Sequence, residues 1–264
     1  MESGAAPNEI MPKTGLTPLI VASAMGREAV ATLQLDAEAN ADAVDAEGFS
    51  SLHYAARDKN AVGIVKALLA HRANPNVRLH QTKPKAVAAS GVFLEGATPL
   101  AIAAEINNLA AIKALVDGGA DPLIGTEQKT TPLILAAGGG TDLARPRSQE
   151  ERATALDTVK YLVERGADVN AAGQFGWTAL HAAAYQGLND VIAFLASRGA
   201  KLDTKDGFGQ TALSISYAII TKDIGDAYYQ SPRVYRRDTA ELLLKSGATP
   251  LEKSGVVAVV KRPE

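Results

Sequence analysis

One spacing recurs along the chain and limits its fold more than any other feature. Six short segments of the form Ser/Thr-x-Leu divide the sequence, and their leucines are Leu19, Leu52, Leu100, Leu133, Leu180 and Leu213. Three of the five intervals equal 33 residues, and the other two exceed 33 by 15 and 14. A fixed period of about 20 to 50 residues is typical of repeat proteins, in which each unit buries its apolar face against its neighbour. The spacing therefore predicts a solenoid.

A second marker repeats in step with the leucines. It is an alanine at Ala39, Ala73, Ala120, Ala167, Ala200 and Ala248, and glycine precedes it in four units. A glycine there fits the left-handed residue that ends a helix. Glu38 and Arg72 take that place in the other two units, at a cost of about 1 kcal/mol each.

The residues inside each unit predict two helices. A Ser or Thr stands two residues before every marker leucine, where its hydroxyl can cap a helix, and proline follows it at Pro18, Pro99 and Pro132. Alanine pairs such as Ala55-Ala56 and Ala183-Ala184 follow the leucine and allow close helix packing. A second helix carries a further leucine five residues before each alanine marker in most units.

Two segments, Gly176–Ala184 (GWTALHAAA) and Glu164–Asn170 (ERGADVN), carry a resemblance to the ankyrin-repeat family. The resemblance covers roughly Gly15 to Pro250 and implies a β-turn plus two antiparallel helices in each repeat. Leu19-Ile20 and Leu133-Ile134 lack the motif histidine, and Ser214–Tyr217 replaces the small pair. The first and last units are the atypical ones, as expected of caps.

We therefore expect one all-α domain over 1–264, an ankyrin-repeat solenoid of about six repeats with hairpin fingers. The predicted repeats are 15–44, 45–77, 93–124, 125–172, 173–205 and 206–250, followed by a C-terminal tail at 251–264. Three insertions interrupt the period, at 78–93, 138–153 and 220–235. Each is either part of a working face or a neutral addition. The apolar run 256–260 is expected to fold back over the last unit.

Composition excludes several classes of function. The formal net charge is −2, which argues against a nonspecific nucleic-acid binder. The chain has no cysteine, so disulfides, thiolate catalysis and Cys-ligated metals are excluded. No apolar run of about 18 residues and no signal peptide are visible, so we expect no membrane span. The compartment stays open: cytoplasmic by default, exported if a leader has been removed.

No residue pattern indicates catalysis. His53 and His181 follow the marker leucine and are expected to be structural, while His71 and His80 have no metal-ligand spacing. The run Gly138–Gly140 follows a helix and precedes no Gly-Lys-Ser/Thr, so it is read as a helix terminator that opens a loop. Arg145, Arg147 and Arg152 are interspersed with acids, as in a solvated loop. Asp203 and Asp206 stand at hairpin positions. We expect no enzyme, no cofactor and no metal.

Aromatic residues give the candidate binding site. With the marker leucine counted as position eight, Phe49 and Trp177 are at position five and Phe175 and Phe208 at position three. The resemblance implies that such positions face a concave groove, where Trp, Tyr and Arg are frequent binding hot spots. The predicted partner-binding residues are Phe49, Arg57, Gln174, Phe175, Trp177, Tyr185, Gln186, Phe208, Tyr228 and Tyr229. Trp177 can alternatively pack sideways on its neighbouring finger.

The second aromatic cluster, from Tyr228 to Arg237, combines tyrosine with arginine and suits a protein partner or an acidic peptide. It can instead cover the apolar end of the stack.

We favour a non-enzymatic, monomeric protein-binding module whose partner protein the sequence does not identify. One alternative is a small-ligand or enzyme-accessory protein with a pocket under the 138–153 or 220–235 insertion. Another is a repeat module attached to an enzyme. Deletion of an insertion separates the first two, because a groove binder keeps its partner and a pocket protein loses its ligand.

Overall fold

The structure is a computed structural model that describes residues 6–80, 94–139, 147–219 and 234–254. These residues divide into two compact units, 1–128 and 129–264. Each unit contains three helix pairs, and the described residues form no strand beyond two isolated bridges. The expected all-α repeat architecture is therefore confirmed. The expectation of a single domain over 1–264 stays a prediction.

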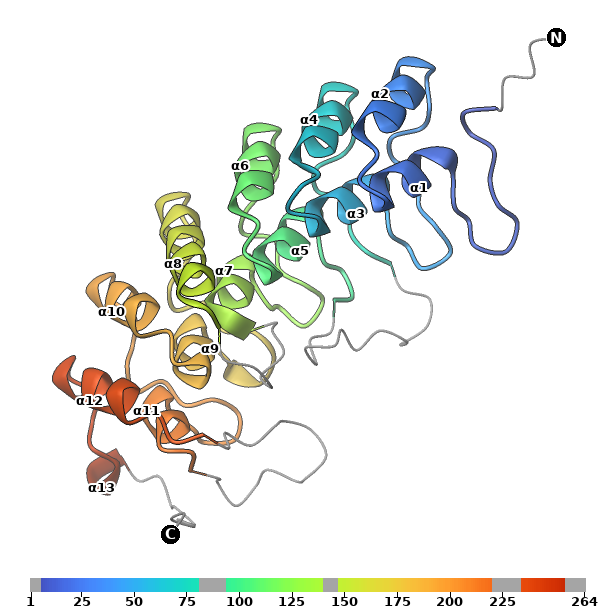
Figure 1. The fold of residues 1–264 in the computed structure, drawn as a ribbon. Coiled ribbons are helices and arrows are strands. Elements are labelled where there is room, and N and C mark those ends of the chain that lie inside the picture. The colour runs from blue at the N-terminus through green and yellow to red at the C-terminus, as the bar shows by residue number, and fades with distance from the viewer. Residues whose placement is uncertain (1–5, 81–93, 140–146, 220–233, 255–264) are drawn as a thin grey trace. The chain divides into compact units, whose positions relative to one another are not determined.

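Unit 1 stacks its helices in two rows (Figure 1). The row of first helices contains α1 (Pro18–Ala24), α3 (Ser51–Arg57) and α5 (Pro99–Glu105). The row of second helices contains α2 (Glu28–Asp36), α4 (Val62–Ala70) and α6 (Leu109–Asp117). Each helix contacts its own partner and the equivalent helix of the next repeat, so the core is a continuous layer between the rows.

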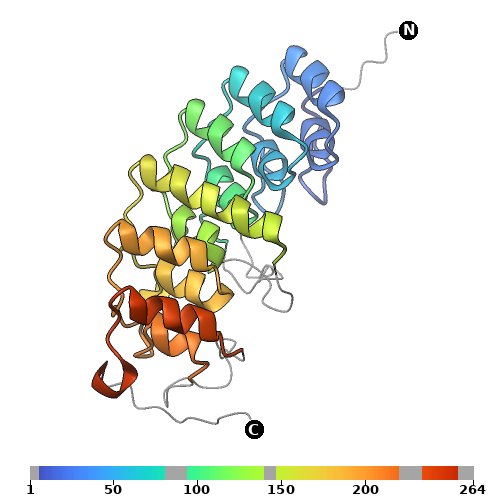
Figure 2. The same ribbon diagram turned by 60° about the vertical axis from the view of Figure 1, so that its left-hand side comes forward.

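Unit 2 repeats this plan (Figure 2), except that its first helix continues as a π-helical turn and the second helix of that pair is longer than the others. Its first helices are α7 (Pro132–Ile134), which continues as the π-helical turn η1 (Leu135–Gly139), then α9 (Ala179–Gln186) and α11 (Ala212–Ser216). Its second helices are α8 (Gln149–Glu164), α10 (Asn189–Ser197) and α12 (Arg237–Lys245). A short 3₁₀ turn, η2 (Gln174–Gly176), precedes α9, and α13 (Leu251–Ser254) follows the last repeat.

The predicted helix starts are confirmed in all six repeats. Each capping residue is extended, and its hydroxyl accepts a hydrogen bond from the backbone N–H three residues later at 3.2–3.4 Å. The capping residues are Thr17, Ser50, Thr98, Thr131, Thr178 and Thr211. Pro18, Pro99 and Pro132 open their helices as expected, since no N–H donor is needed there.

The predicted helix ends are confirmed as well. The four glycines before the alanine marker have left-handed backbones, with φ values of 92°, 93°, 84° and 105° at Gly119, Gly166, Gly199 and Gly247. Glu38 and Arg72 adopt the same conformation at φ 61° and 63°, although they carry side chains. The following residue then bonds back to the helix, as Ala120 N does to Leu115 O at 2.8 Å.

Small side chains fill the layer between the helix rows. The alanine pairs of the first helices are fully buried, and so are the recurring leucines of the second helices from Leu68 to Leu243. Each buried leucine contributes about 1.5–3 kcal/mol. The short alanines let the first helices of neighbouring repeats approach closely, which is why so few aromatic residues are needed in the core.

A ladder of asparagine and aspartate side chains joins consecutive repeats within each unit, and it also joins the segment before the first repeat to that repeat. The repeat period alone does not predict these bonds. In every step a side-chain oxygen accepts a hydrogen bond from a backbone N–H of the next repeat. The steps, at 2.6–2.8 Å, are Asn8–Asn40, Asp42–Asn74 and Asn76–Asp121 in unit 1, and Asn170–Lys201 and Asp203–Thr249 in unit 2. Asp203 therefore has a structural role, as expected from its hairpin position.

The two motif histidines form a second set of bonds between repeats. His53 Nδ1 accepts a hydrogen bond from Ser50 N at 3.1 Å, so its Nε2 donates to Ala97 O of the next repeat at 3.2 Å. His181 bonds Thr178 N and Gln210 O in the same way, at 3.2 Å each. Burial lowers the pKa of His53 to about 4 and also lowers the pKa of His181. Both imidazoles are therefore neutral structural groups, as expected.

The second insertion is partly helical, which corrects the expectation of a solvated loop over 138–153. Helix α8 has 16 residues whereas the other second helices have 9, and its extra turns begin at Gln149. Ser148 caps it, and Ser148 N in turn donates a hydrogen bond to Glu151 Oε2 at 2.8 Å. This Ser-x-x-Glu capping box is itself a sequence signal for a helix start. The remainder of this insertion, and most of the other two, lies outside the described residues.

Loss of one ladder side chain should weaken the junction between two repeats. Asn76→Ala removes the bond to Asp121 N and the bond from Nδ2 to Gly119 O at 3.2 Å. We expect the free energy of unfolding, measured by urea denaturation, to fall by about 1–2 kcal/mol. Lys59→Ala, at an exposed loop position, should change it by less than about 0.5 kcal/mol. Equal effects of the two substitutions would contradict the role given to the ladder.

The neutral histidines predict a loss of stability in acid. Because the folded pKa of His53 is about 4 and that of free histidine is 6.5, the unfolded chain binds the proton more tightly. The stabilisation is complete above pH 6.5 and should decline as the pH falls toward 4, by up to about 3 kcal/mol. His53→Gln should flatten this decline, whereas His71→Gln, at an exposed position, should not. Identical pH profiles for wild type and His53→Gln would show that His53 is not the group responsible.

Candidate protein-binding surface

The predicted binding residues fall in different parts of the chain. Phe49 and Arg57 belong to unit 1, and Tyr228 and Tyr229 lie outside the described residues. The other six belong to unit 2. They are Gln174, Phe175, Trp177, Tyr185, Gln186 and Phe208.

Phe49 is buried, which corrects the expectation that it faces solvent. Only 7% of Phe49 is exposed, and its ring lies 5.9 Å from the ring of His53 and 5.4 Å from that of Tyr54. Asp45 sets this arrangement, because one carboxylate oxygen accepts Phe49 N at 2.9 Å and the other accepts the Tyr54 hydroxyl at 2.7 Å. Burial and the neighbouring carboxylate raise the pKa of Tyr54. Arg57, at the end of α3, is exposed.

The hairpin finger before α9, residues 173–177, differs from the other fingers in its backbone conformation. Phe175 has φ 57° and the next residue, Gly176, has φ 74°, so two consecutive residues are left-handed. The Phe175 side chain is 41% exposed, and its ring lies 5.5 Å from that of Phe208 in the following finger. Gly207 N donates a hydrogen bond to Phe175 O. The two finger tips of unit 2 are therefore joined by both backbone and aromatic contacts.

Trp177 lies where this finger enters α9 and is half-buried. Its indole stacks on His181 with centroids 5.5 Å apart, and it meets Tyr185 edge-on at 6.1 Å. These contacts are with the first helix of its own repeat. His181 is itself fixed by hydrogen bonds, so it gives the indole a rigid base.

Gln186 is buried, which corrects the expectation that it faces a partner protein. It is 7% exposed and packs against Gly138 of η1, where a Cβ atom would lie only 2.5 Å from Gln186 Cγ. Gly138 has φ 107° and ends the first helix of its repeat, which confirms the reading of that glycine as a terminator. Gln174 and Tyr185 are half-buried.

Arg236 is a site residue that the sequence analysis noted but did not select. Its Nε donates to Tyr185 O, the carbonyl at the end of α9, at 2.9 Å. Burial lowers the pKa of this guanidinium, and the charge of Arg152 lowers it further. Arg152 is therefore near enough to repel it, and it lies on α8 instead of in a loop. Arg236 could be assigned to this site only from the structure, because its place depends on how the third insertion returns to the helix stack.

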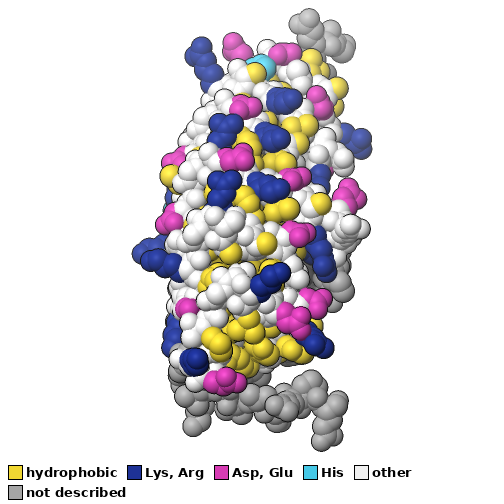
Figure 3. Space-filling model, turned by 90° about the vertical axis from the view of Figure 1, so that its left-hand side faces the viewer, with side chains coloured by type: hydrophobic (Ala, Val, Ile, Leu, Met, Phe, Trp, Pro, Cys, Tyr) yellow, Lys and Arg dark blue, Asp and Glu magenta, His cyan; other side chains and the backbone are white. Residues whose placement is uncertain are grey.

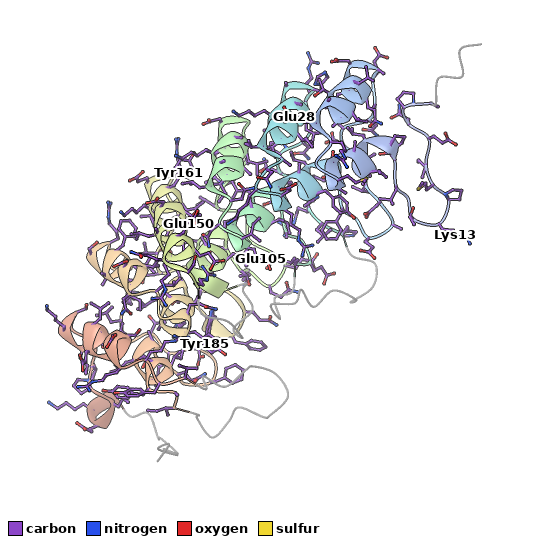
Figure 4. The ribbon with its side chains drawn as sticks, viewed as in Figure 1. Lys13, Glu28, Glu105, Glu150, Tyr161 and Tyr185 are labelled. Atoms are coloured by element: carbon purple, nitrogen blue, oxygen red, sulfur yellow. The ribbon has the colours of Figure 1, made fainter. Side chains whose placement is uncertain are left out.

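The second helices of unit 2 carry aromatic rings that are covered by arginine side chains. Tyr161 of α8 and Phe194 of α10 are each covered by an arginine whose Cζ lies 5.0 Å from the ring centroid. Tyr161 and Tyr185 lie on different helix rows (Figure 4). On the face shown in Figure 3, basic and acidic side chains are interspersed. The second helices of unit 2 thus shield their aromatic rings with charge, whereas the fingers expose Phe175.

The described residues contain no arrangement suited to a metal. No group of three His, Asp or Glu side chains among them could hold an ion. Asp206 accepts hydrogen bonds from Phe208 N and Gln210 N at 2.9 and 2.8 Å, so it shapes its finger. In the described part of the chain, no helix combines the length and the apolar character that a membrane crossing requires.

Comparison with known proteins agrees with this architecture. The family profile for ankyrin repeats in three copies matches residues 1–78 and 151–254, and the profile for a single ankyrin repeat matches 95–127. The Neurogenic locus Notch protein of Drosophila melanogaster is 36% identical over 106 residues. That stretch is 40% of this chain and 4% of the Notch protein, so the chain spans a small part of this relative. Since the family matches cover more than half of its residues, the chain belongs to the ankyrin-repeat family.

Proposed function

We propose that the chain binds a partner protein through one surface of unit 2, formed by Phe175, Trp177, Tyr185 and Phe208, which we call the aromatic face. Ankyrin repeats and the similarity to Notch support a protein–protein interaction module. The observation that carries the choice of surface is Phe175, which is both exposed and held in a left-handed backbone conformation.

The conformation of Phe175 costs free energy that the fold does not require. The equivalent residues of the other five fingers are Thr14, Glu47, Glu95, Gln128 and Phe208, and none of them has a positive φ. A non-glycine residue in this region costs about 1–2 kcal/mol. Such strain is typical of functional sites, where the surrounding structure holds a side chain in one place. In this chain the left-handed backbone of Phe175 places its ring beside that of Phe208, at the tips of two neighbouring fingers.

Rigidity gives the aromatic face its binding mechanism. Trp177 stacks on a hydrogen-bonded histidine, and the backbone of its finger is tied to the next finger. Little side-chain freedom is therefore lost when a partner docks, so more of the contact energy appears as affinity. A few hot-spot residues carry most of the binding energy at protein interfaces, and Trp, Tyr and Arg are enriched among them. The proposed role needs no catalytic group, and we propose a monomer that acts as a non-enzymatic scaffold.

Removal of the Trp177 indole should weaken partner binding and leave the fold intact. We expect Trp177→Ala to lower the melting temperature by only a few degrees, because Trp177 is half-buried. It should weaken partner binding by about 2 kcal/mol or more, as for a central hot-spot residue. The measurement is affinity capture from a lysate of the source organism with wild-type and variant chains, followed by mass spectrometry and a thermal melt of each chain.

Phe194→Ala is the matched control, since Phe194 is a half-buried aromatic residue of the same unit on the opposite helix row. Proteins captured by wild type and by Phe194→Ala but lost with Trp177→Ala would support the aromatic face. Capture of the same proteins by all three chains would refute it. Loss of folding in Trp177→Ala would show that Trp177 belongs to the core.

Phe175→Asn should weaken binding without weakening the fold. Asparagine tolerates the left-handed conformation, so relief of about 1 kcal/mol of strain offsets the lost ring contact with Phe208, which is worth a similar amount. The free energy of unfolding should therefore stay within about 1 kcal/mol of wild type, while capture declines. A fall in stability with undiminished capture would mean that Phe175 serves the fold alone.

A further inference from the structure

The guanidinium of Arg236 is held in place, but only its Nε donates a hydrogen bond to a described residue. Its Nε bonds to Tyr185 O, and its plane lies against Gly187, where a Cβ atom would lie 2.9 Å from Nη1 and 3.3 Å from Cζ. Among the described residues, no oxygen accepts a hydrogen bond from the two terminal nitrogens and no carboxylate pairs with the charge. The group is half-buried, and donors that lose water without gaining a partner lower stability.

A second arginine adds to the positive charge at this place. Arg152 projects from the extra turns of α8 and is exposed, and no described carboxylate pairs with it. After burial, its positive charge is the next cause that lowers the pKa of Arg236. By contrast, the neighbouring Arg237 points away into an exposed ion pair, with its Nε 2.8 Å from Glu241 Oε1. Arg236 is thus fixed at the end of α9 by a hydrogen bond, Arg152 of another repeat adds positive charge to its surroundings, and neither has a described counter-charge.

We propose that Arg236 and Arg152 receive a carboxylate side chain of the partner protein, next to the apolar residues that dock on the aromatic face. This inference rests on the proposed function and specifies its partner: a segment with Asp or Glu beside an aromatic or aliphatic residue. Tyr185 connects the two parts of the site, since its ring meets Trp177 and its carbonyl holds Arg236.

The capping of α9 explains only part of this arrangement. A cation near the end of a helix is favourable, and the Nε bond satisfies one terminal carbonyl. The Nη1 and Nη2 groups bond no oxygen in the described part of the chain, and their forked geometry matches the two oxygens of a carboxylate. Helix capping also gives no role to the Arg152 side chain, which forms no ion pair with a described carboxylate.

The test is a selection of random peptides displayed on phage against the immobilised full chain. Peptides recovered by wild type should be enriched in Asp and Glu next to aromatic or aliphatic residues. The enrichment should disappear on Arg152→Gln/Arg236→Gln and persist on Arg198→Gln, whose arginine covers Phe194 on the opposite row. For one recovered peptide, changing its Glu to Gln should weaken binding to wild type about tenfold or more and leave binding to the double variant unchanged.

The single variant Arg152→Gln keeps the inference falsifiable if Arg236→Gln does not fold, because the exposed Arg152 side chain makes no hydrogen bond to a described residue. Recovered peptides without a preference for acids, or the same preference on the double variant, would overturn the inference. Peptides that bind Trp177→Ala as tightly as wild type would instead overturn the proposed function. Recovery of no peptide by wild type would count against both.

Discussion

The structure depends on hydrogen bonds that pass from one repeat to a backbone group of the next. In unit 1, Asp42 and Asn76 reach forward to amides of the following repeat, and His53 reaches forward to the carbonyl of Ala97. Asn76 follows the second helix of its repeat and His53 lies in the first turn of its first helix, so this repeat is bonded to the next one at two places. The alanine faces between them then pack closely enough to exclude water. The polar bonds thus set how each repeat is placed on its neighbour and add to stability, while apolar burial supplies the larger share of the stability.

This division explains how a strained finger can persist. In unit 2, His181 fixes the start of α9 through Thr178 and the finger of the next repeat through Gln210. Phe175 lies just before the first of these anchors and contacts the finger that carries the second, so it can adopt a left-handed backbone without loosening the repeat. The same anchors hold Trp177 and Phe208 in defined positions. A binding surface built in this way is ready before its partner arrives.

Features that depend on local chemistry could be predicted from the sequence. A threonine before a helix, a proline at its first position and a glycine after its last turn act within a few residues, so the period located all of them correctly. Burial of particular side chains could not be predicted in this way. Phe49 is covered because Asp45 draws Tyr54 over it, and Gln186 is covered because the neighbouring repeat has Gly138 in place of a larger residue. Both outcomes require contacts that the repeat pattern does not encode. The pairing of Arg236 with the end of α9 is hidden for the same reason.

The central claim is that a partner docks on the fingers and first helix of unit 2. Hydrogen–deuterium exchange of the full chain, with and without an excess of a phage-selected peptide, tests it most directly. We predict slower exchange in 173–178, in 206–211 and at the end of α9, with little change elsewhere. Slower exchange confined to α8, α10 and α12, or to unit 1, would contradict the claim.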